Sequence, residues 1–351
     1  MLDIKTILGA AHEKDASDIH LTVGIPPVVR VDGQLIQLPD CGRLMPDETS
    51  RLAEELMDEY STKIFEENGE VDFSYSVVGF GRFRVNVFKQ RGTISMALRT
   101  VPLSVPAIDD LGLPPILKEL SMKKRGLVLV TGPTGSGKST TLAAMIDHMN
   151  KHRNGHIITL EDPIEYLHRH GKCIINQREV GHDTFSYANA LRAALRQDPD
   201  IILIGEMRDL ETISTAVTAA ETGHLVLSTL HTIGAVQTID RIIDVFPPDQ
   251  QQQIKVQLAS VLEGVVSQQL IKKSDNKGRI ASLEIMLANA AIRNHIREGK
   301  THQILSALQT GRKHGMVTMD AYLTELYRQG LISYNDAILH AVDRDMLARL
   351  L

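Results

Sequence analysis

The stretch that decides the fold is GLVLVTGPTGSGKSTT, at residues 126–141. It begins with an apolar run at 127–130 that predicts a short buried strand, and apolar residues recur at helical spacing from Leu142 to Met149. Between them lies a glycine-rich loop of the form G-x-x-x-x-G-K-S/T, and a strand, this loop and a helix in succession form a phosphate-binding site. A chance glycine turn with a surface lysine is the simpler alternative, and the eight matching positions argue against it.

The loop predicts ATP and Mg²⁺ as cofactors. Its glycines let the backbone turn tightly, so that successive N–H groups point inward at phosphate oxygens. We expect Lys138 to reach the β- and γ-phosphates and the Ser139 hydroxyl to ligate Mg²⁺. The candidate nucleotide-binding residues of the loop are Gly132, Pro133, Thr134, Gly135, Ser136, Gly137, Lys138, Ser139 and Thr140.

The composition is that of an ordinary globular protein. The chain has 351 residues, 43% hydrophobic and 23% charged, which predicts two or three domains and argues against disorder. A net charge of −5 argues against broad nucleic-acid binding. Cys41 and Cys173 stand far apart, so we expect neither a disulfide framework nor a zinc knuckle. Lone thiols are typical of the cytoplasm, and because no apolar run is long enough to span a bilayer, any membrane association is expected to be peripheral.

Residues 1–100 predict a small mixed α/β domain. The Asp32-Gly33 dipeptide lies between two runs of strand-like sequence and predicts a hairpin over 28–38. The other expected elements are a helix within 1–15, a strand at 17–23, a helix at 47–60, and strands near 70–77, 82–90 and 93–101.

Three arginines of these strands are candidate nucleotide ligands. Arg82 and Arg84 share one face of their strand, and Arg99 lies opposite the apolar face of the next one. A solvated outer face would explain the pattern equally well. The functional alternative is that these side chains contact the nucleotide of a neighbouring subunit.

Residues 118–272 alternate strands with helices, which predicts a parallel sheet with ligands at the carboxyl ends of its strands. The proline-rich stretch 101–117 is expected to be the linker and hinge, and residues 273–351 a helical subdomain. From Pro248 onward the pattern is read as helical, with one stripe running from Ile254 to Val265. The expected strands are 127–131, 156–160, 201–205 and 225–229, with helices near 139–151, 184–197, 209–222, 300–310 and 318–329.

Acidic residues follow two of these strands. Glu161 and Glu165 follow the strand at 156–160, and one of them would orient the attacking water. The pattern does not rank the two, and an ordinary acidic loop is the simpler explanation. Glu206 follows the strand at 201–205, where a phosphate-loop protein places a Mg²⁺-associated acid, and its length suggests contact through a metal-bound water.

A histidine stands at each end of the strand at 225–229. His231 follows the strand and is well placed to sense the γ-phosphate. His224 precedes it. Each histidine, taken alone, would also fit a structural role, and neither has the neighbours that a zinc site needs.

With these motifs in place, the chain resembles the secretion-type hexameric ATPases of the GspE/PilB/PilT superfamily, and within it the type IV pilus retraction ATPases. The resemblance extends from ASDIHL at 16–21 to GHLVLSTLH at 223–231. The segment AIRNHIRE at 291–298 is similar to the AIRNLIRE segment of retraction ATPases, with His295 in place of leucine. The long N-terminal domain and four-cysteine zinc module usual in extension and type II secretion ATPases are not found here, which favours retraction.

The resemblance implies a PAS-like domain at 1–100, a RecA-like ATPase core and the helical subdomain, assembled as a homohexamer that hydrolyses Mg-ATP to retract pili. It implies Glu165 as the catalytic base, Glu206 as the Mg²⁺-associated acid, Glu161 and His231 beside them, and arginines acting between subunits. It also places His224 among the nucleotide-binding residues.

The implied partner is an inner-membrane platform protein of the pilus, contacted through residues 291–298, and peripheral membrane association would follow from that contact. The same segment would alternatively be plain helix with a surface arginine pair. Two other functions stay open. One is an extension or type II secretion motor of the same fold, and the other is an accessory subunit that binds ATP without appreciable turnover.

Overall fold

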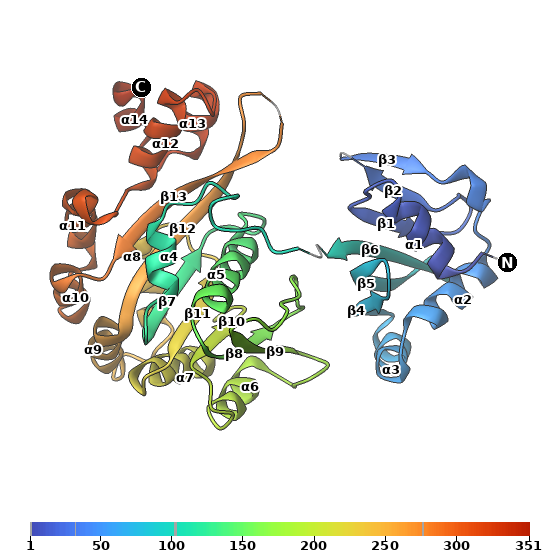
Figure 1. Ribbon diagram of the computed structural model, residues 1–351, viewed down its shortest axis with the longest axis horizontal. Coiled ribbons are helices and arrows are strands. Elements are labelled where there is room, and N and C mark those ends of the chain that lie inside the picture. Colours follow the sequence, from blue (N-terminus) through green and yellow to red (C-terminus); the bar gives the residue numbers. More distant parts are fainter. Residues whose placement is uncertain (1, 32, 102–103, 276) are drawn as a thin grey trace. The chain divides into compact units, whose positions relative to one another are not determined.

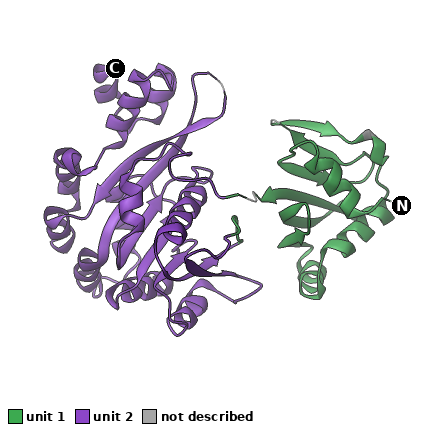
Figure 2. Cartoon of the chain, viewed as in Figure 1, with its two compact units in different colours: residues 1–104, 163–167 green, residues 105–162, 168–351 purple. Residues whose placement is uncertain are grey.

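The computed structural model describes residues 2–31, 33–101, 104–275 and 277–351 (Figure 1). It divides into two compact units, one of Met1–Ser104 with Pro163–Leu167 and the other of Val105–Asp162 with His168–Leu351 (Figure 2). Asp32 of the predicted hairpin turn and Pro102 of the predicted linker lie outside the described residues.

The first unit is an antiparallel sheet of strand order β3-β2-β1-β6-β5-β4 with helices packed on one face. Its core joins helix residues such as Ile7, Leu52 and Phe65 to strand residues such as Val85 and Leu98. The elements are α1 (Ile4–His12), β1 (Asp18–Leu21), β2 (Val28–Val31), β3 (Gln34–Gln37), η1 (Pro39–Cys41), α2 (Pro46–Leu56), α3 (Glu59–Asn68), β4 (Glu70–Val77), β5 (Gly81–Gln90) and β6 (Thr93–Val101).

The single helix predicted at 47–60 is wrong, because this region holds nearly all of α2 and the start of α3. α2 ends at Leu56, and the Asp58 carboxylate then accepts a hydrogen bond of 2.7 Å from the backbone N–H of Ser61. Aspartate is a favoured residue for starting a helix in this way. The predicted strands and the 28–38 hairpin pairing are present.

The second unit is built on a mixed sheet of strand order β13-β12-β7-β11-β10-β8-β9, in which β13 is antiparallel to β12 and the other neighbours are parallel. Both faces are buried. Leu127 and Leu129 of β7 belong to one apolar cluster, and Val128 and Val130 belong to the other. A strand covered on both sides needs apolar residues at every position, which explains the run that opens the deciding stretch.

The strands and helices predicted between residues 127 and 229 are present. The elements of this unit are α4 (Ile116–Ser121), β7 (Gly126–Thr131), α5 (Lys138–His152), β8 (Gly155–Glu161), β9 (Cys173–Glu179), α6 (Tyr187–Ala194), β10 (Ile201–Ile204), α7 (Leu210–Glu221), β11 (Leu225–Leu230), α8 (Ala235–Asp244), α9 (Gln251–Val261), β12 (Leu262–Lys272), β13 (Arg279–Leu287), α10 (Ala290–Arg297), η2 (Thr301–Gln303), α11 (Ile304–Thr310), η3 (Gly311–His314), α12 (Met319–Arg328), α13 (Tyr334–His340) and α14 (Arg344–Leu350).

The helical stripe predicted from Ile254 to Val265 is wrong in its second half. α9 ends at Val261, and the chain continues directly into β12. Because β12 is buried on both faces for much of its length, its sequence lacks the alternation that would distinguish a strand from a helix. β12 and β13 pair from Gly264–Leu287 to Lys272–Arg279, so the boundary expected between 272 and 273 separates two paired strands.

The C-terminal helices form their own apolar cluster, to which β12 contributes Ile271. The predicted stop at Gly330 and restart at Ser333 are present, since the Ser333 hydroxyl accepts a hydrogen bond of 3.1 Å from the N–H of Asp336 at the start of α13. None of the helices in the described ranges combines the length and apolar character that a membrane span requires.

Candidate active site

The glycine-rich loop joins the end of β7 to the start of α5. Gly135 and Gly137 have φ values of 77° and 88°, in the left-handed region that glycine adopts readily. The buried Lys138 ammonium donates hydrogen bonds to the carbonyl oxygens of Gly132 and Pro133, at 2.9 and 3.0 Å. The lysine therefore lies across the loop, and the Ser139 hydroxyl group stands in the first turn of α5.

Three predicted site residues lie at the same edge of the sheet as the loop. Glu161 is the last residue of β8, Glu206 follows β10 by two residues, and His231 comes directly after β11. These strands are parallel neighbours of one another, and β11 is also a parallel neighbour of β7, so their carboxyl ends point the same way (Figure 1). This edge is where open parallel sheets bind their ligands.

The Glu206 carboxylate brings two other side chains together. One oxygen lies 3.2 Å from Nε2 of His231, and the other lies 2.6 Å from a guanidinium nitrogen of Arg208. Glu206 is largely buried, whereas Arg208 is mostly exposed. Sequence reasoning predicted the acid and the histidine and missed Arg208, which directly follows Glu206-Met207 at the tip of the strand.

Glu161 and Glu165 lie in different surroundings. Glu161 accepts hydrogen bonds at one carboxylate oxygen from the Thr159 hydroxyl at 2.6 Å and from the Gln177 amide at 3.1 Å. Both donors hold its carboxylate at the strand end. Glu165 is exposed and belongs to the segment Pro163–Leu167, which groups with the first unit.

Tyr187, which starts α6, is another residue that sequence reasoning missed. Burial raises the pKa of its phenol, and the carboxylates of Asp162, Glu206 and Glu161 raise it further. A Cβ atom at Gly205 would lie 2.7 Å from the Tyr187 hydroxyl oxygen, so the glycine makes room for the phenol beside β10. The site therefore includes a protonated hydroxyl group among its carboxylates.

His224 lies at the other edge of the sheet from the phosphate loop, and its assignment to nucleotide binding stays a prediction. It precedes β11, and its carbonyl oxygen accepts a hydrogen bond of 3.0 Å from the N–H of Gly126 at the start of β7. Its Nδ1 lies 2.9 Å from the carbonyl oxygen of Ala219, near the end of α7. These two contacts fit the structural role that is the simpler alternative for this histidine.

The candidate arginines lie on β5 and β6 of the first unit. Arg84 and Arg99 are directly opposite each other in the strand register. Arg84 pairs with Asp72 at 3.7 Å, and Arg99 donates a hydrogen bond of 2.9 Å to Asp18. Burial of Asp18 opposes its ionisation, but hydrogen bonds from Arg99 and a serine hydroxyl outweigh that effect and lower the pKa of the carboxyl group. Arg82 lies two residues before Arg84 on the same face of β5.

The segment 291–298 forms most of α10. Ile292 and Ile296 are buried, and Arg293 donates to the carbonyl oxygens of Ala259 and Ser260 at 2.8 and 2.9 Å. Its guanidinium group also pairs with Glu263 at 2.8 Å. Arg293 therefore has a role inside the fold.

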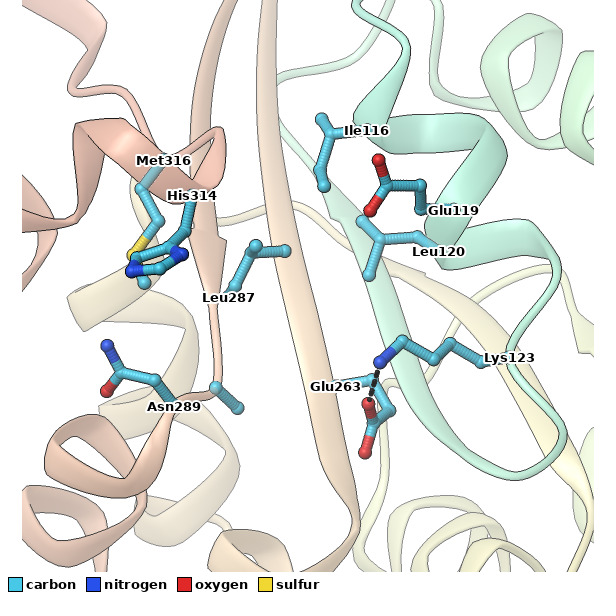
Figure 3. Close-up of a pocket in the computed structure, with 10 residues that line it drawn as sticks. Ile116, Glu119, Leu120, Lys123, Glu263, Leu287, Asn289, His314 and Met316 are labelled. Atoms are coloured by element: carbon cyan, nitrogen blue, oxygen red, sulfur yellow. Dashed lines mark ion pairs between the residues drawn. The ribbon is translucent and has the colours of Figure 1, made fainter.

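A cavity of about 310 Å³ lies beside α10 and is lined by Asn289, Glu263 and Lys123, with the last two 3.0 Å apart (Figure 3). Glu263 follows the start of β12, near the start of β7, so this cavity is at the opposite edge of the sheet from the phosphate loop.

A phosphate loop between a buried strand and a helix, with acids and a histidine at the ends of adjacent parallel strands, defines a P-loop ATPase with a RecA-like sheet. The chain belongs to the family described as Type II/IV secretion system protein, whose sequence model matches residues 2–335. It is an ATPase of this family with the α/β fold expected from its sequence.

The similarity to known proteins extends over almost the whole chain. It is 51% identical over 338 residues to the "Type IV pilus retractation ATPase PilT" of Pseudomonas aeruginosa, covering 96% of this chain and 97% of the relative. It is 44% identical over 340 residues to the type IV pilus ATPase PilU of the same organism, covering 97% and 89%. A crystal structure of the pilus retraction motor PilT with bound ADP superimposes with a TM-score of 0.94 at 53% identity, covering 99% of this chain and 100% of that one.

Proposed function

We propose that this chain is the ATP-hydrolysing motor of type IV pilus retraction, acting as a cytoplasmic homohexamer. The observation that carries the proposal is the match to PilT over nearly the full length of both chains. The lower identity to PilU favours the primary retraction motor over an auxiliary one. The phosphate loop and the Glu206–His231 pair at one sheet edge supply the chemistry that such a motor needs.

Phosphate binding would rest on the loop and Lys138. Backbone N–H groups and the ammonium group would stabilise charge on the transferring phosphoryl group. The Ser139 hydroxyl and the Glu206 carboxylate are the hard oxygen ligands that Mg²⁺ prefers, with Glu206 acting through a water molecule. When bound, Mg²⁺ neutralises charge on the phosphates. The Nε2–H group of His231 would donate a hydrogen bond to the Glu206 carboxylate, and this contact would change when a γ-phosphate is bound.

Water activation is assigned to Glu165. Glu161 is held through one carboxylate oxygen by Thr159 and Gln177, whereas Glu165 is exposed. Arginines of a neighbouring subunit, drawn from Arg82, Arg84 and Arg99, would complete the site. Hinge motion within 101–117 would then rotate whole domains, and this rotation would pass from one subunit of the ring to the next.

The partner would be an inner-membrane pilus platform protein contacted through α10, which would bring the motor to the membrane peripherally. Arg297 and Glu298 are exposed on this segment, whereas Arg293 packs against α9 and β12. The cavity beside Asn289 offers a recess next to that surface (Figure 3).

Phosphate release by the purified protein tests the enzyme. Substituting Lys138→Ala should lower turnover of Mg-ATP by about a hundredfold or more, because a charged group aimed at the phosphates is lost. The exposed Lys172→Ala, in the same unit, should leave turnover unchanged. Equal and negligible rates for wild type and Lys138→Ala would instead support the non-hydrolysing accessory subunit.

A pilus count separates retraction from extension. Cells carrying Lys138→Ala should accumulate surface pili and lose twitching motility. Scarce pili in those cells would support an extension or secretion motor.

A further inference from the structure

One side chain of β12 makes hydrogen bonds to the phosphate loop and to the helix that follows it. Gln268 is only 3% exposed. Its amide nitrogen donates a hydrogen bond of 2.8 Å to the carbonyl oxygen of Ser136 in the loop. Its amide oxygen accepts a hydrogen bond of 2.8 Å from the Thr141 hydroxyl in the first turns of α5. The amide thus ties the middle of the loop to the helix that follows it.

The first and last glycines of the motif pack against the same residue. A Cβ atom at Gly132 would lie 2.1 Å from the Gln268 carbonyl oxygen, and one at Gly137 would lie 2.8 Å from its amide nitrogen. The first distance is to a backbone atom, so a side chain at Gly132 would clash with β12 itself. The second is to the end of the Gln268 side chain, so a side chain at Gly137 would displace that amide. The loop therefore lies directly on Gln268.

The strand register explains why this residue meets the loop. β7 and β12 pair in parallel up to Thr131 and Ser267. Gln268 is the next residue of β12, so it lies beside the point where β7 ends and the loop begins. β12 continues to Lys272, so the residue on which the loop packs lies within a continuous strand.

We propose that Gln268 is a positioning residue for nucleotide binding. Its amide fixes the separation between Ser136 and Thr141, and this holds the N–H groups of the loop in the geometry that binds phosphate. A loop that is already held in its binding conformation loses less conformational entropy when a ligand binds. The inference rests on the proposed ATPase motor and adds to it a residue that does not itself touch the phosphates.

The test measures ADP affinity of the full-length protein by calorimetry and the melting temperature without nucleotide. Gln268→Met keeps the length of the side chain and removes both hydrogen bonds, so the Kd for ADP should rise about tenfold, equivalent to about 1.4 kcal/mol. Because the loop N–H groups also bind the phosphates of the substrate before the reaction, the KM for ATP should rise more than kcat falls. Gln269→Met is the matched control, because Gln269 bonds to His340 at 2.8 Å and has no contact with the loop among the described hydrogen bonds.

Thr141→Val removes one of the two hydrogen bonds and should raise the Kd for ADP severalfold. The double variant should bind ADP no more weakly than Gln268→Met alone, because both act through one contact. A merely structural role would lower the melting temperature of Gln268→Met and leave its ADP affinity within twofold of wild type, which would overturn the proposal. If Gln268→Met does not fold, unchanged ADP affinity in Thr141→Val overturns it equally. Failure of the wild-type protein to bind ADP would count against the ATPase motor itself.

Discussion

Glu284 of β13 is a carboxylic acid buried in the second unit, at 7% exposure. It accepts a hydrogen bond of 2.7 Å from the N–H of Ala235, at the start of α8, and another from the N–H of Met319, at the start of α12. Burial raises the pKa of Glu284, these two hydrogen bonds partly offset the rise, and the nearby Asp320 adds to it. The acid therefore joins the sheet to two helices while resisting ionisation.

This resistance predicts a pH dependence of stability. Above the ordinary glutamate pKa of about 4.5, the unfolded chain releases a proton that folded Glu284 retains. The free energy of unfolding should therefore fall as the pH rises from that value to the raised pKa, and level off beyond it. Other acids such as Asp18 titrate in both proteins, so the effect of Glu284 is the difference between two curves. Denaturant unfolding at a series of pH values should show the free energy of the wild type falling relative to that of Glu284→Gln as the pH rises. Parallel curves for the two proteins would contradict the prediction.

Residues at strand ends were predictable, and those that meet across the fold were not. Glu206 and His231 come within two residues of the ends of apolar strands, so the sequence predicts them at the ligand-binding edge. Tyr187 and Gln268 reach the site from elements whose packing the sequence does not specify locally. Their only sequence signals are a short polar run, Ser267 to Gln269, between apolar residues and a tyrosine at a helix start, and both patterns are common.

At the scale of elements, the two arginines of α10 have different surroundings. Arg293 reaches the last carbonyl groups of α9, where a cation is favoured by the helix dipole, and it pairs with Glu263. Arg297 is exposed and ends α10. The fold uses the first arginine and leaves the second on the surface.

The two arginines should differ in their effect on stability. Arg293→Ala should lower the free energy of unfolding by about 1.5–3 kcal/mol, the usual size of hydrogen bonds to a charged group. Arg297→Ala should change it by less than about 0.5 kcal/mol, as is usual for surface substitutions. Denaturant unfolding of both variants measures the difference, and equal losses would contradict the assignment. Twitching by cells carrying Arg297→Ala then tests the partner-facing surface without a change in stability.

The elements also show where pattern reading fails. The hairpin of the first unit, the phosphate loop and the alternating strands and helices from 127 to 229 carry clear local signals. The passage from α9 to β12 has a weak signal, because Val261 ends the helix and Leu262 starts the strand with no residue between them, and Gly264 comes only at the third position of β12. The register that brings β12 beside β7 is a long-range property.

At the scale of the whole molecule, the proposed ring predicts that subunits share active sites. Lys138→Ala subunits would keep their arginines, and subunits carrying Arg84→Ala with Arg99→Ala would keep their phosphate loop. Each protein alone should be nearly inactive, since an arginine supplied by a neighbour is worth about 10³-fold or more in phosphoryl transfer. In randomly mixed rings roughly a quarter of the sites would have both parts, so turnover should recover toward that fraction.

Phosphate release after mixing, dissociation and reassembly measures this recovery. Each variant treated alone in the same way is the control. Near wild-type turnover by the arginine variant on its own would show that these residues form a solvated outer face. Turnover equal to the sum of the separate variants would show that the arginines act within their own subunit.

The paired strands β12 and β13 have a mechanical consequence. Their hydrogen bonds run from Gly264–Leu287 to Lys272–Arg279 and lie across the strand direction. A tensile force entering through the C-terminal helices and directed along β13 would load these bonds together in shear, whereas a peeling force would break them one after another. The attachment of those helices to the sheet should therefore resist a force directed along β13 better than a force in any other direction.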